Sequence, residues 1–261
     1  MQLGTRSSGR KPDLPGSETC EPVSGMTFED IWALKPRDTN EQIFEFYRDQ
    51  GAWSTFRQCV RHVDLIGLHL NVFKIVAQYF SQTRGSLANI HFLEYGCGVA
   101  PFINTLLSTI QGDPELIKTL KFSISDVEGC EHLTFANWRL NRLYKKNNLG
   151  VAIELCPVKP AKLPTYSSKL DCVFLFEVME HVPSPVETIT NLMQQMNQGC
   201  LLAENFIEHD HDHGDDSTGP DLESAADERD EYYKILDGNF QLIVGDPHIK
   251  APNETRIWRK L

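Results

Sequence analysis

The chain has 261 residues, of which 41% are hydrophobic, and a formal net charge of −11. That length suits one α/β domain with an appendage, and the apolar content is sufficient for a sizeable core. The lack of any run of about 18 apolar residues argues against a membrane partner, and the acidic balance without a broad basic face argues against a nucleic-acid partner.

The first part of the chain divides into a polar segment and a helical region. Residues 1–25 are polar and lack the apolar core of a secretory signal, so we expect disorder there. Apolar residues then recur at helical spacing over 27–50 and 53–80. We therefore predict a helical cap over residues 26–85 that packs against or over the functional site. Its Tyr47 is a candidate to cover a ligand, and burial in the core is the alternative.

The most informative stretch is residues 91–101, His-Phe-Leu-Glu-Tyr-Gly-Cys-Gly-Val-Ala-Pro. Residues that favour a strand run into an acid, Glu94, and two glycines follow at a two-residue spacing. The pattern predicts a strand over 90–95, a tight turn at the glycines and a helix over 99–110. Such a turn lets a ligand approach bare backbone, and the helix N-terminus after it presents unpaired N–H groups.

Two kinds of nucleotide-type ligand use a glycine turn of this kind, and the spacing helps to separate them. A dinucleotide fingerprint, G-x-G-x-x-G or G-x-G-x-x-A, requires a third small residue. Pro101 occupies that position in this chain. The match therefore fails, and an oxidoreductase with a nucleotide cofactor is disfavoured.

A second informative region spans residues 170–206. Leu170–Phe176 is an apolar, strand-favouring run that ends in Glu177, a helical pattern covers 184–197, and another strand is predicted over 200–206. Alternation of strands and helices implies a mostly parallel sheet with right-handed crossovers. The other predicted elements are a helix over 131–147 and strands over 121–125, 151–156, 239–245 and 255–261.

Together the two regions resemble class I S-adenosylmethionine-dependent methyltransferases. Residues 94–98 match E-x-G-x-G, and residues 171–182 match D-x-V-x-x-x-E-V-x-E-H-V. The resemblance covers residues 88–206 and is similar to the small-molecule branch that includes ubiquinone-biosynthesis-type enzymes. It implies an α/β fold with a Rossmann-like, mostly parallel seven-stranded sheet and helices on both faces, to which the helical cap is added. It also implies S-adenosylmethionine as the cofactor and a small molecule as the methyl acceptor.

The resemblance assigns the cofactor contacts to residues at the carboxyl ends of the predicted strands. Asp126 ends the second strand, where a carboxylate can accept both ribose hydroxyls; a turn or N-cap role is the alternative. An inserted loop around Gln111–Pro114 accounts for its long separation from Glu94. Tyr47 is included because a sulfonium cation benefits from an aromatic neighbour. The predicted cofactor-binding residues are Glu94, Gly96, Cys97, Gly98, Asp126, Val127, Glu177 and Tyr47.

The catalytic candidates are Glu177, His181 and His209. Glu177 is expected at the centre of the cleft, and His181 follows where a general base could act on a hydroxyl or an amine, with structural packing as the alternative. His209 belongs to the run Glu208–Asp216, in which His and Asp alternate. This run has three interpretations: metal ligands, a catalytic His209, or a solvated acidic lid, which we favour. We predict no bound metal.

The net charge is concentrated in one segment. Residues 204–231 hold twelve acids and one arginine, so they account for the whole net charge of −11. We predict an acidic lid over 207–233, which favours a cationic or amine-bearing acceptor. Basic residues at helical spacing are interpreted as a solvated helix face; they are Arg139, Arg142, Lys145 and Lys146.

The seven cysteines are scattered, and they form no C-x-x-C pair. This favours free thiols in a reducing, cytoplasmic setting over disulfides or a zinc site. We thus predict a cytoplasmic small-molecule methyltransferase whose cofactor-binding domain spans residues 86–261. Two alternatives stay open: a methyltransferase that acts on a protein or peptide, and a non-catalytic module that keeps the fold and the cofactor pocket.

Overall fold

The computed structural model describes residues 39–49, 51–146, 153–206, 222–246 and 255–261. The predicted disordered segment, residues 1–25, lies outside these ranges, as do residues 26–38 of the predicted cap. Among the described residues no helix is both long enough and apolar enough to span a membrane.

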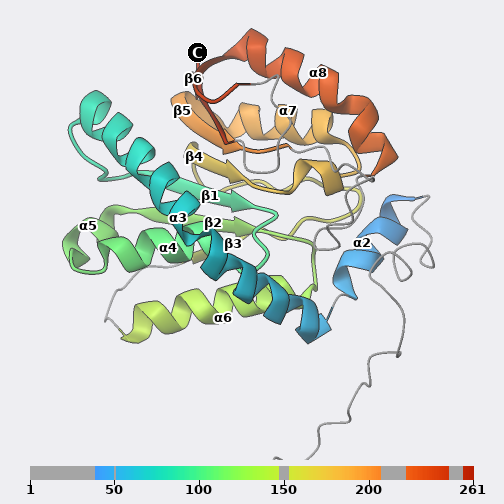
Figure 1. The fold of residues 1–261 in the computed structure, drawn as a ribbon, viewed down its shortest axis with the longest axis horizontal. Helices are drawn as coiled ribbons and strands as arrows, with labels where there is room; N and C mark the ends of the chain where they lie inside the picture. The colour runs from blue at the N-terminus through green and yellow to red at the C-terminus, as the bar shows by residue number, and fades with distance from the viewer. Residues whose placement is uncertain (1–38, 50, 147–152, 207–221, 247–254) are drawn as a thin grey trace, which may run out of the picture.

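One seven-stranded sheet forms the centre of the molecule, with the strand order β3-β2-β1-β4-β5-β7-β6 (Figure 1). All neighbouring strands are parallel except β7, which runs antiparallel to both β5 and β6. This confirms the predicted mostly parallel sheet. The strands are β1 His91–Tyr95, β2 Lys121–Ser125, β3 Ile153–Leu155, β4 Leu170–Leu175, β5 Met196–Glu204, β6 Phe240–Val244 and β7 Arg256–Lys260.

Helices cover both faces of the sheet. One short helix, α5, occupies Pro114–Thr119, directly after the predicted inserted loop. Asp113 caps it by accepting a hydrogen bond from the N–H of Leu116 at 3.0 Å, and Pro114 at the first helical position fits the helix without losing a needed donor. The other helices are α2 Asn40–Arg48, α3 Gly51–Arg84, α4 Pro101–Ile110, α6 Glu131–Lys146, α7 Pro185–Gln195, α8 Glu223–Asn239 and a 3₁₀ turn, η1, at Met179–His181.

The strand side chains alternate between two hydrophobic cores, as the period of two along a strand requires. Phe92 of β1 faces the core built with α3, α4 and α6, whereas Leu93 faces the core built with α2, α7 and α8. Both residues are fully buried. Strands of a sheet that is covered on both faces have nearly continuous apolar sequences, which explains why β1 and β4 stand out in the sequence.

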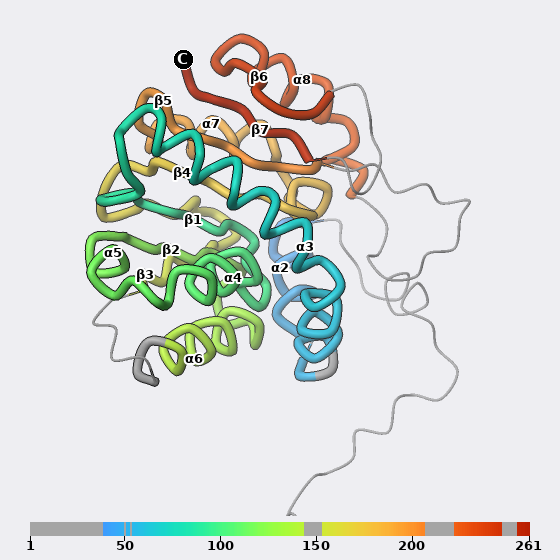
Figure 2. The backbone as a smooth tube through the Cα atoms, turned by 60° about the vertical axis from the view of Figure 1, so that its left-hand side comes forward, coloured from blue at the N-terminus to red at the C-terminus, as the bar shows by residue number. Residues whose placement is uncertain are grey.

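The predicted cap contains two parts with different positions. The C-terminal half of α3 packs on the sheet through buried Val72, Val76 and Phe80, and therefore belongs to the main helical layer. By contrast, α2 and the first half of α3 lie beside each other, and α2 lies beyond the arrowheads of the parallel strands (Figures 1 and 2). Only this second part is placed to cover a site at the carboxyl ends of the strands.

The predicted acidic lid, 207–233, has a different C-terminal boundary in the structure. Residues 207–221, including His209, lie outside the described ranges. From Glu223 onward the chain is already α8, whose Ala225, Arg229 and Tyr232 are buried. This part of the acidic segment therefore covers the sheet, because its apolar residues recur at helical spacing and pack against α7 and β6.

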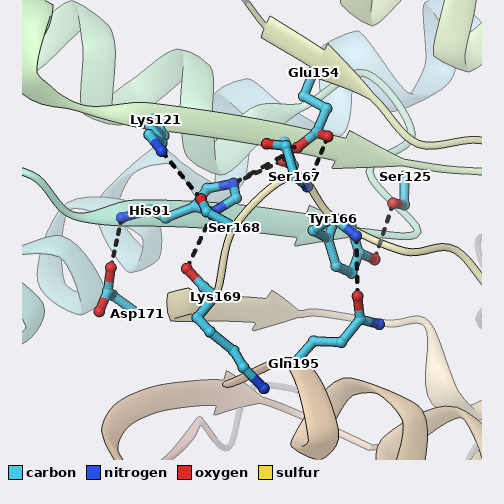
Figure 3. Close-up of polar contacts among 11 residues, drawn as sticks. His91, Lys121, Ser125, Glu154, Tyr166, Ser167, Ser168, Lys169, Asp171 and Gln195 are labelled. Carbon is cyan, nitrogen blue, oxygen red and sulfur yellow. Dashed lines mark hydrogen bonds and ion pairs between the residues drawn. The ribbon is translucent and has the colours of Figure 1, made fainter. Parts of the chain in front are cut away.

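A polar cluster replaces a crossover helix between β3 and β4, where residues 156–169 form no helix (Figure 3). The Ser123 hydroxyl donates to Glu154 Oε2 at 2.6 Å, and His91 Nε2 lies 2.8 Å from Ser123 Oγ. Glu154 Oε1 accepts the N–H of Ser167 at 2.9 Å. Since the Ser123 hydroxyl donates its proton to Glu154, His91 donates from Nε2, and burial lowers the pKa of His91. Side chains of three strands thus anchor the connecting segment.

The cysteines of the described residues are free, in agreement with the prediction, and five of these six are buried. Among the described residues no group of three or more His, Cys, Asp or Glu side chains is arranged to hold a metal ion.

Candidate functional site

A cavity of about 1190 Å³ lies at the carboxyl ends of β1, β2 and β4. The strand order reverses between β1 and β4, and open α/β sheets bind ligands in the crevice at such a switch point. The walls come from α2, the first half of α3, the turn after β1, residues 158–163 and the segment after β4.

The turn after β1 has left-handed backbone at three alternate residues. The φ angles are +60° at Gly96, +49° at Gly98 and +53° at Ala100. A β-carbon on Gly96 would lie 2.5 Å from both methyl groups of Val178, so only glycine fits there. The Cys97 N–H donates to the carbonyl of Ser125 at 2.8 Å, which joins the turn to the end of β2.

Glu94 anchors the helix that follows this turn. Its side chain is 4% exposed; Oε1 accepts the N–H of Phe102 at 3.0 Å, and Oε2 accepts the N–H of Ile103 at 2.9 Å. The carboxylate thereby satisfies two unpaired donors in the first turn of α4. Burial raises the pKa of Glu94 to about 8, although these two bonds and Arg139 oppose the shift. Glu94 lines the cavity, and its contacts in the structure are with α4.

Asp126, directly after β2, connects the second strand to the glycine turn. Its Oδ2 accepts the N–H of Gly98 at 2.7 Å, and its Oδ1 accepts the N–H of Val127 at 2.7 Å. A carboxylate has about four acceptor positions, so each oxygen can accept one further hydrogen bond. Asp126 lines the cavity and is therefore placed to receive two hydroxyl groups of a ligand as well.

The first prediction concerns Asp126→Ala. If Asp126 accepts the ribose hydroxyls, this variant should bind S-adenosylhomocysteine more weakly by about 1–3 kcal/mol, the usual cost of an unpaired buried partner. Titration calorimetry measures the affinity. Glu128→Ala is a matched control, because Glu128 lies nearby but is half-exposed and pairs with Lys159 at 2.9 Å. If the Asp126 and Glu128 variants bind with equal affinity, Asp126 does not accept the ribose hydroxyls and serves only to hold the turn.

Glu177 follows β4 in a conformation that is rare for a residue with a side chain. Its φ is +54°, its N–H donates to Asn205 Oδ1 at 2.6 Å, and its Oε2 lies 2.5 Å from Arg61 Nη2 of α3. Left-handed backbone at such a residue persists only where surrounding contacts enforce it, and it is concentrated at functional sites. The geometry places a carboxylate at the cavity wall where it already receives a cation.

Comparison with solved structures finds similar folds at low sequence identity. Magnesium protoporphyrin IX methyltransferase (ChlM) of Synechocystis, solved with bound S-adenosylmethionine, is 17% identical, with a TM-score of 0.52 over 86% of this chain and 97% of that one. The plantazolicin methyltransferase BpumL, solved with S-adenosylhomocysteine, is 9% identical, with a TM-score of 0.52 over 85% and 95% of the two chains. The DszA carbon methyltransferase is 11% identical, with a TM-score of 0.54 over 74% and 54%.

The chain has the Rossmann-like fold of these three solved structures. Comparison with protein-family models finds no match, and comparison with curated protein sequences finds none either. The fold is thus shown by the structure, and the predicted α/β class is confirmed.

The remaining predicted residues gather at the same cavity, apart from one. Cys97, Val127, His181 and Tyr47 all line it, and the rings of Tyr47 and His181 lie 6.0 Å apart. Cys97 is 2% exposed, and burial raises the pKa of its thiol. His209 lies outside the described residues, so its assignment stays a prediction.

The cavity suits a cofactor that carries a ribose and a positively charged group. The glycine turn gives access to backbone, Asp126 has acceptor capacity for hydroxyls, and Glu177 receives a cation. Two further lining residues, His69 and His132, are 3% and 6% exposed, and His69 Nδ1 and His132 Nε2 are buried without a hydrogen-bond partner in the described part of the chain. Unpaired polar atoms are costly in a protein interior, so their presence at the wall favours a polar ligand.

The sequence did not predict a role at the site for three residues: Gln58, His62 and Arg139. The interpretation of Arg139 as part of a solvated face is wrong, because its guanidinium donates to the carbonyl of Val99 and to His62, both at 2.9 Å. Arg142, one turn later, is exposed as expected. Helical spacing predicts the face of the helix on which Arg139 lies, but not its partners Val99 and His62, which are 40 and 77 residues away. No signal in the sequence marks these contacts.

Proposed function

We propose that this chain is an S-adenosylmethionine-dependent methyltransferase that acts on a small-molecule acceptor. The observation that carries the proposal is a single cavity that joins the glycine turn, Asp126 and Glu177 at the switch point of the sheet. The bound cofactors of two structures with the same fold support the choice of S-adenosylmethionine.

When bound, S-adenosylmethionine supplies a methyl group on a positively charged sulfur. The chain contributes binding and alignment, which account for much of the rate of such transfers. In the proposal Asp126 accepts the ribose hydroxyls, the turn at Gly96 and Gly98 gives close backbone access, and Glu177 with Tyr47 surrounds positive charge. Helix α2 and the first half of α3 exclude water from the cavity.

The acceptor enters, in this proposal, on the side formed by α2, α3 and residues 158–163. Glu177 pairs with the Arg61 guanidinium at this wall, and in the proposal an amine-bearing acceptor shares that carboxylate with Arg61. Charged residues of both signs line this side of the cavity: Glu41, Asp49, Arg57, Asp64, Lys159 and Lys162.

A general base is needed only if the acceptor must lose a proton. Burial lowers the pKa of His62 to about 4 and that of His69 to about 3, so both are poor bases near neutral pH. We therefore retain His181, which lines the cavity beside Tyr47, as the candidate base. The free, largely buried cysteines support a reducing, cytoplasmic setting.

The experiment is incubation of the full chain with methyl-labelled S-adenosylmethionine and separated fractions of a cell extract. We expect label in the small-molecule fraction, enriched among amines, as measured by mass spectrometry. Label in the protein fraction would instead indicate a protein or peptide methyltransferase. Cofactor binding without any labelled product would leave a binding module of the same fold.

A further inference from the structure

The carbonyl of Val99 lies between two left-handed residues of the glycine turn, Gly98 and Ala100. For Ala100 this backbone is unfavourable because its β-carbon crowds the following carbonyl. Such a conformation persists where neighbouring contacts determine it. The contact at this point comes from α6, whose Arg139 Nη1 donates to the Val99 carbonyl at 2.9 Å.

The same guanidinium binds a second partner, on α3. Arg139 Nη2 lies 2.9 Å from His62 Nδ1, and His62 Nε2 lies 3.0 Å from Thr105 Oγ1 of α4. A guanidinium has only donors, so Nδ1 must accept, and His62 donates from Nε2 to Thr105. Burial, followed by the charge of Arg139, lowers the pKa of His62 to about 4, so this neutral tautomer is kept at neutral pH.

These contacts close a ring around the turn. The turn leads directly into α4, and Thr105 lies in the second turn of that helix. One histidine–arginine pair therefore fixes both the turn, at Val99, and the helix, at Thr105. On the same face of α3, one helical turn before His62, Gln58 Oε1 lies against Gly98, only 2.2 Å from where a β-carbon would be.

We propose that Arg139 and His62 are positioning residues that hold the glycine turn in its cofactor-binding conformation and couple α3 to cofactor affinity. The inference rests on the proposed function. Arg139 acts from behind the turn and is not among the residues that line the cavity in the described part of the chain. Its effect therefore passes through Val99, and not through contact with a ligand.

The test compares Arg139→Gln and His62→Leu with wild type in the full chain. We expect each variant to bind S-adenosylhomocysteine about 10-fold more weakly, the effect of losing a charge-assisted hydrogen bond. Amide hydrogen exchange should become faster over residues 97–103 and stay unchanged elsewhere. The double variant should lose little more affinity than either single variant, because both changes break the same connection.

Two further variants separate positioning from general destabilisation. His62→Gln can accept from Arg139 and donate to Thr105, so it should recover most of the lost affinity. Arg142→Gln removes an exposed arginine of the same helix, whose guanidinium lies over the ring of Trp138, and should bind as wild type does. If R139Q does not fold, H62L and H62Q are compared by hydrogen exchange over residues 97–103 without ligand, because His62, unlike Arg139, also lines the cavity.

Wild-type binding with equal affinity in R139Q and H62L would overturn the positioning role. The role would also be overturned if R142Q lost as much affinity as R139Q and H62L, with the losses in all three in proportion to lost thermal stability. A wild-type chain that binds neither S-adenosylhomocysteine nor S-adenosylmethionine would overturn the proposed function itself, and with it the coupling of these residues to the cofactor.

Discussion

A Gly98→Val variant should lose S-adenosylhomocysteine binding by about 100-fold or more, a loss of roughly 3 kcal/mol. The β-carbon would lie 2.2 Å from Gln58 Oε1, and the φ of +49° is a strained conformation for a β-branched residue. The Gln58 side chain can turn away from the clash, but the strained φ is relieved only if the backbone moves, and with it the N–H that Asp126 accepts at 2.7 Å. Titration calorimetry on the folded variant measures the loss.

Two variants show which part of the effect belongs to the turn. At Gly112 an added β-carbon would meet no other atom within 4 Å, so Gly112→Ala should leave binding unchanged. Gly98→Ala combined with Gln58→Ala removes the clash but keeps the positive φ, so it should bind at an intermediate level. Gly98→Val with affinity close to wild type would show that the cofactor does not approach this turn.

Arg256→Ala should lower the free energy of unfolding by about 3–5 kcal/mol, because it leaves a buried charge without its partner. Arg256 and Glu204 are 1% and 0% exposed; Nε lies 2.7 Å from Oε1 and Nη2 lies 3.1 Å from Oε2. Trp258 Nε1 donates to the same Oε1 at 3.0 Å. Arg256 also donates to the carbonyl of Phe206 at 3.3 Å, which fixes the chain beside Asn205 of the site.

Urea unfolding followed by fluorescence measures this change, with Arg259→Ala as the control on the same strand. Arg259 bonds to Gln241 near the surface, so its removal should cost less than about 1 kcal/mol. The double variant Glu204→Leu/Arg256→Leu should be more stable than Arg256→Ala, since it leaves neither charge unpaired. A loss below about 1 kcal/mol in Arg256→Ala would contradict the buried pair.

The sequence predicted much of the fold because its strongest signals are local. The apolar strand before Gly96 and Gly98, and the run from Leu170 to Leu175, both lie in the sheet as expected. The helix at Pro114–Thr119 was missed because Asp113 and Pro114 are as typical of a turn as of a helix start. The end of the predicted lid was wrong because acidic composition hid the apolar spacing of α8.

For the candidate site, spacing predicted which residues end the strands but not what each one contacts. Glu94 and Asp126 both line the cavity, yet the hydrogen bonds that the structure gives them are to backbone N–H groups. The role of α3 was also hidden, because Arg61 and His62 meet partners 116 and 77 residues away that no local pattern connects.

The most direct test of the proposed cofactor site is calorimetric titration of the full chain with S-adenosylmethionine and S-adenosylhomocysteine, with and without a metal chelator. We expect one site with an affinity on the order of micromolar, equal in both conditions, and a matching rise in thermal stability. No binding heat and no stabilisation at about 1 mM of either compound would contradict the proposal that this cavity is a cofactor site.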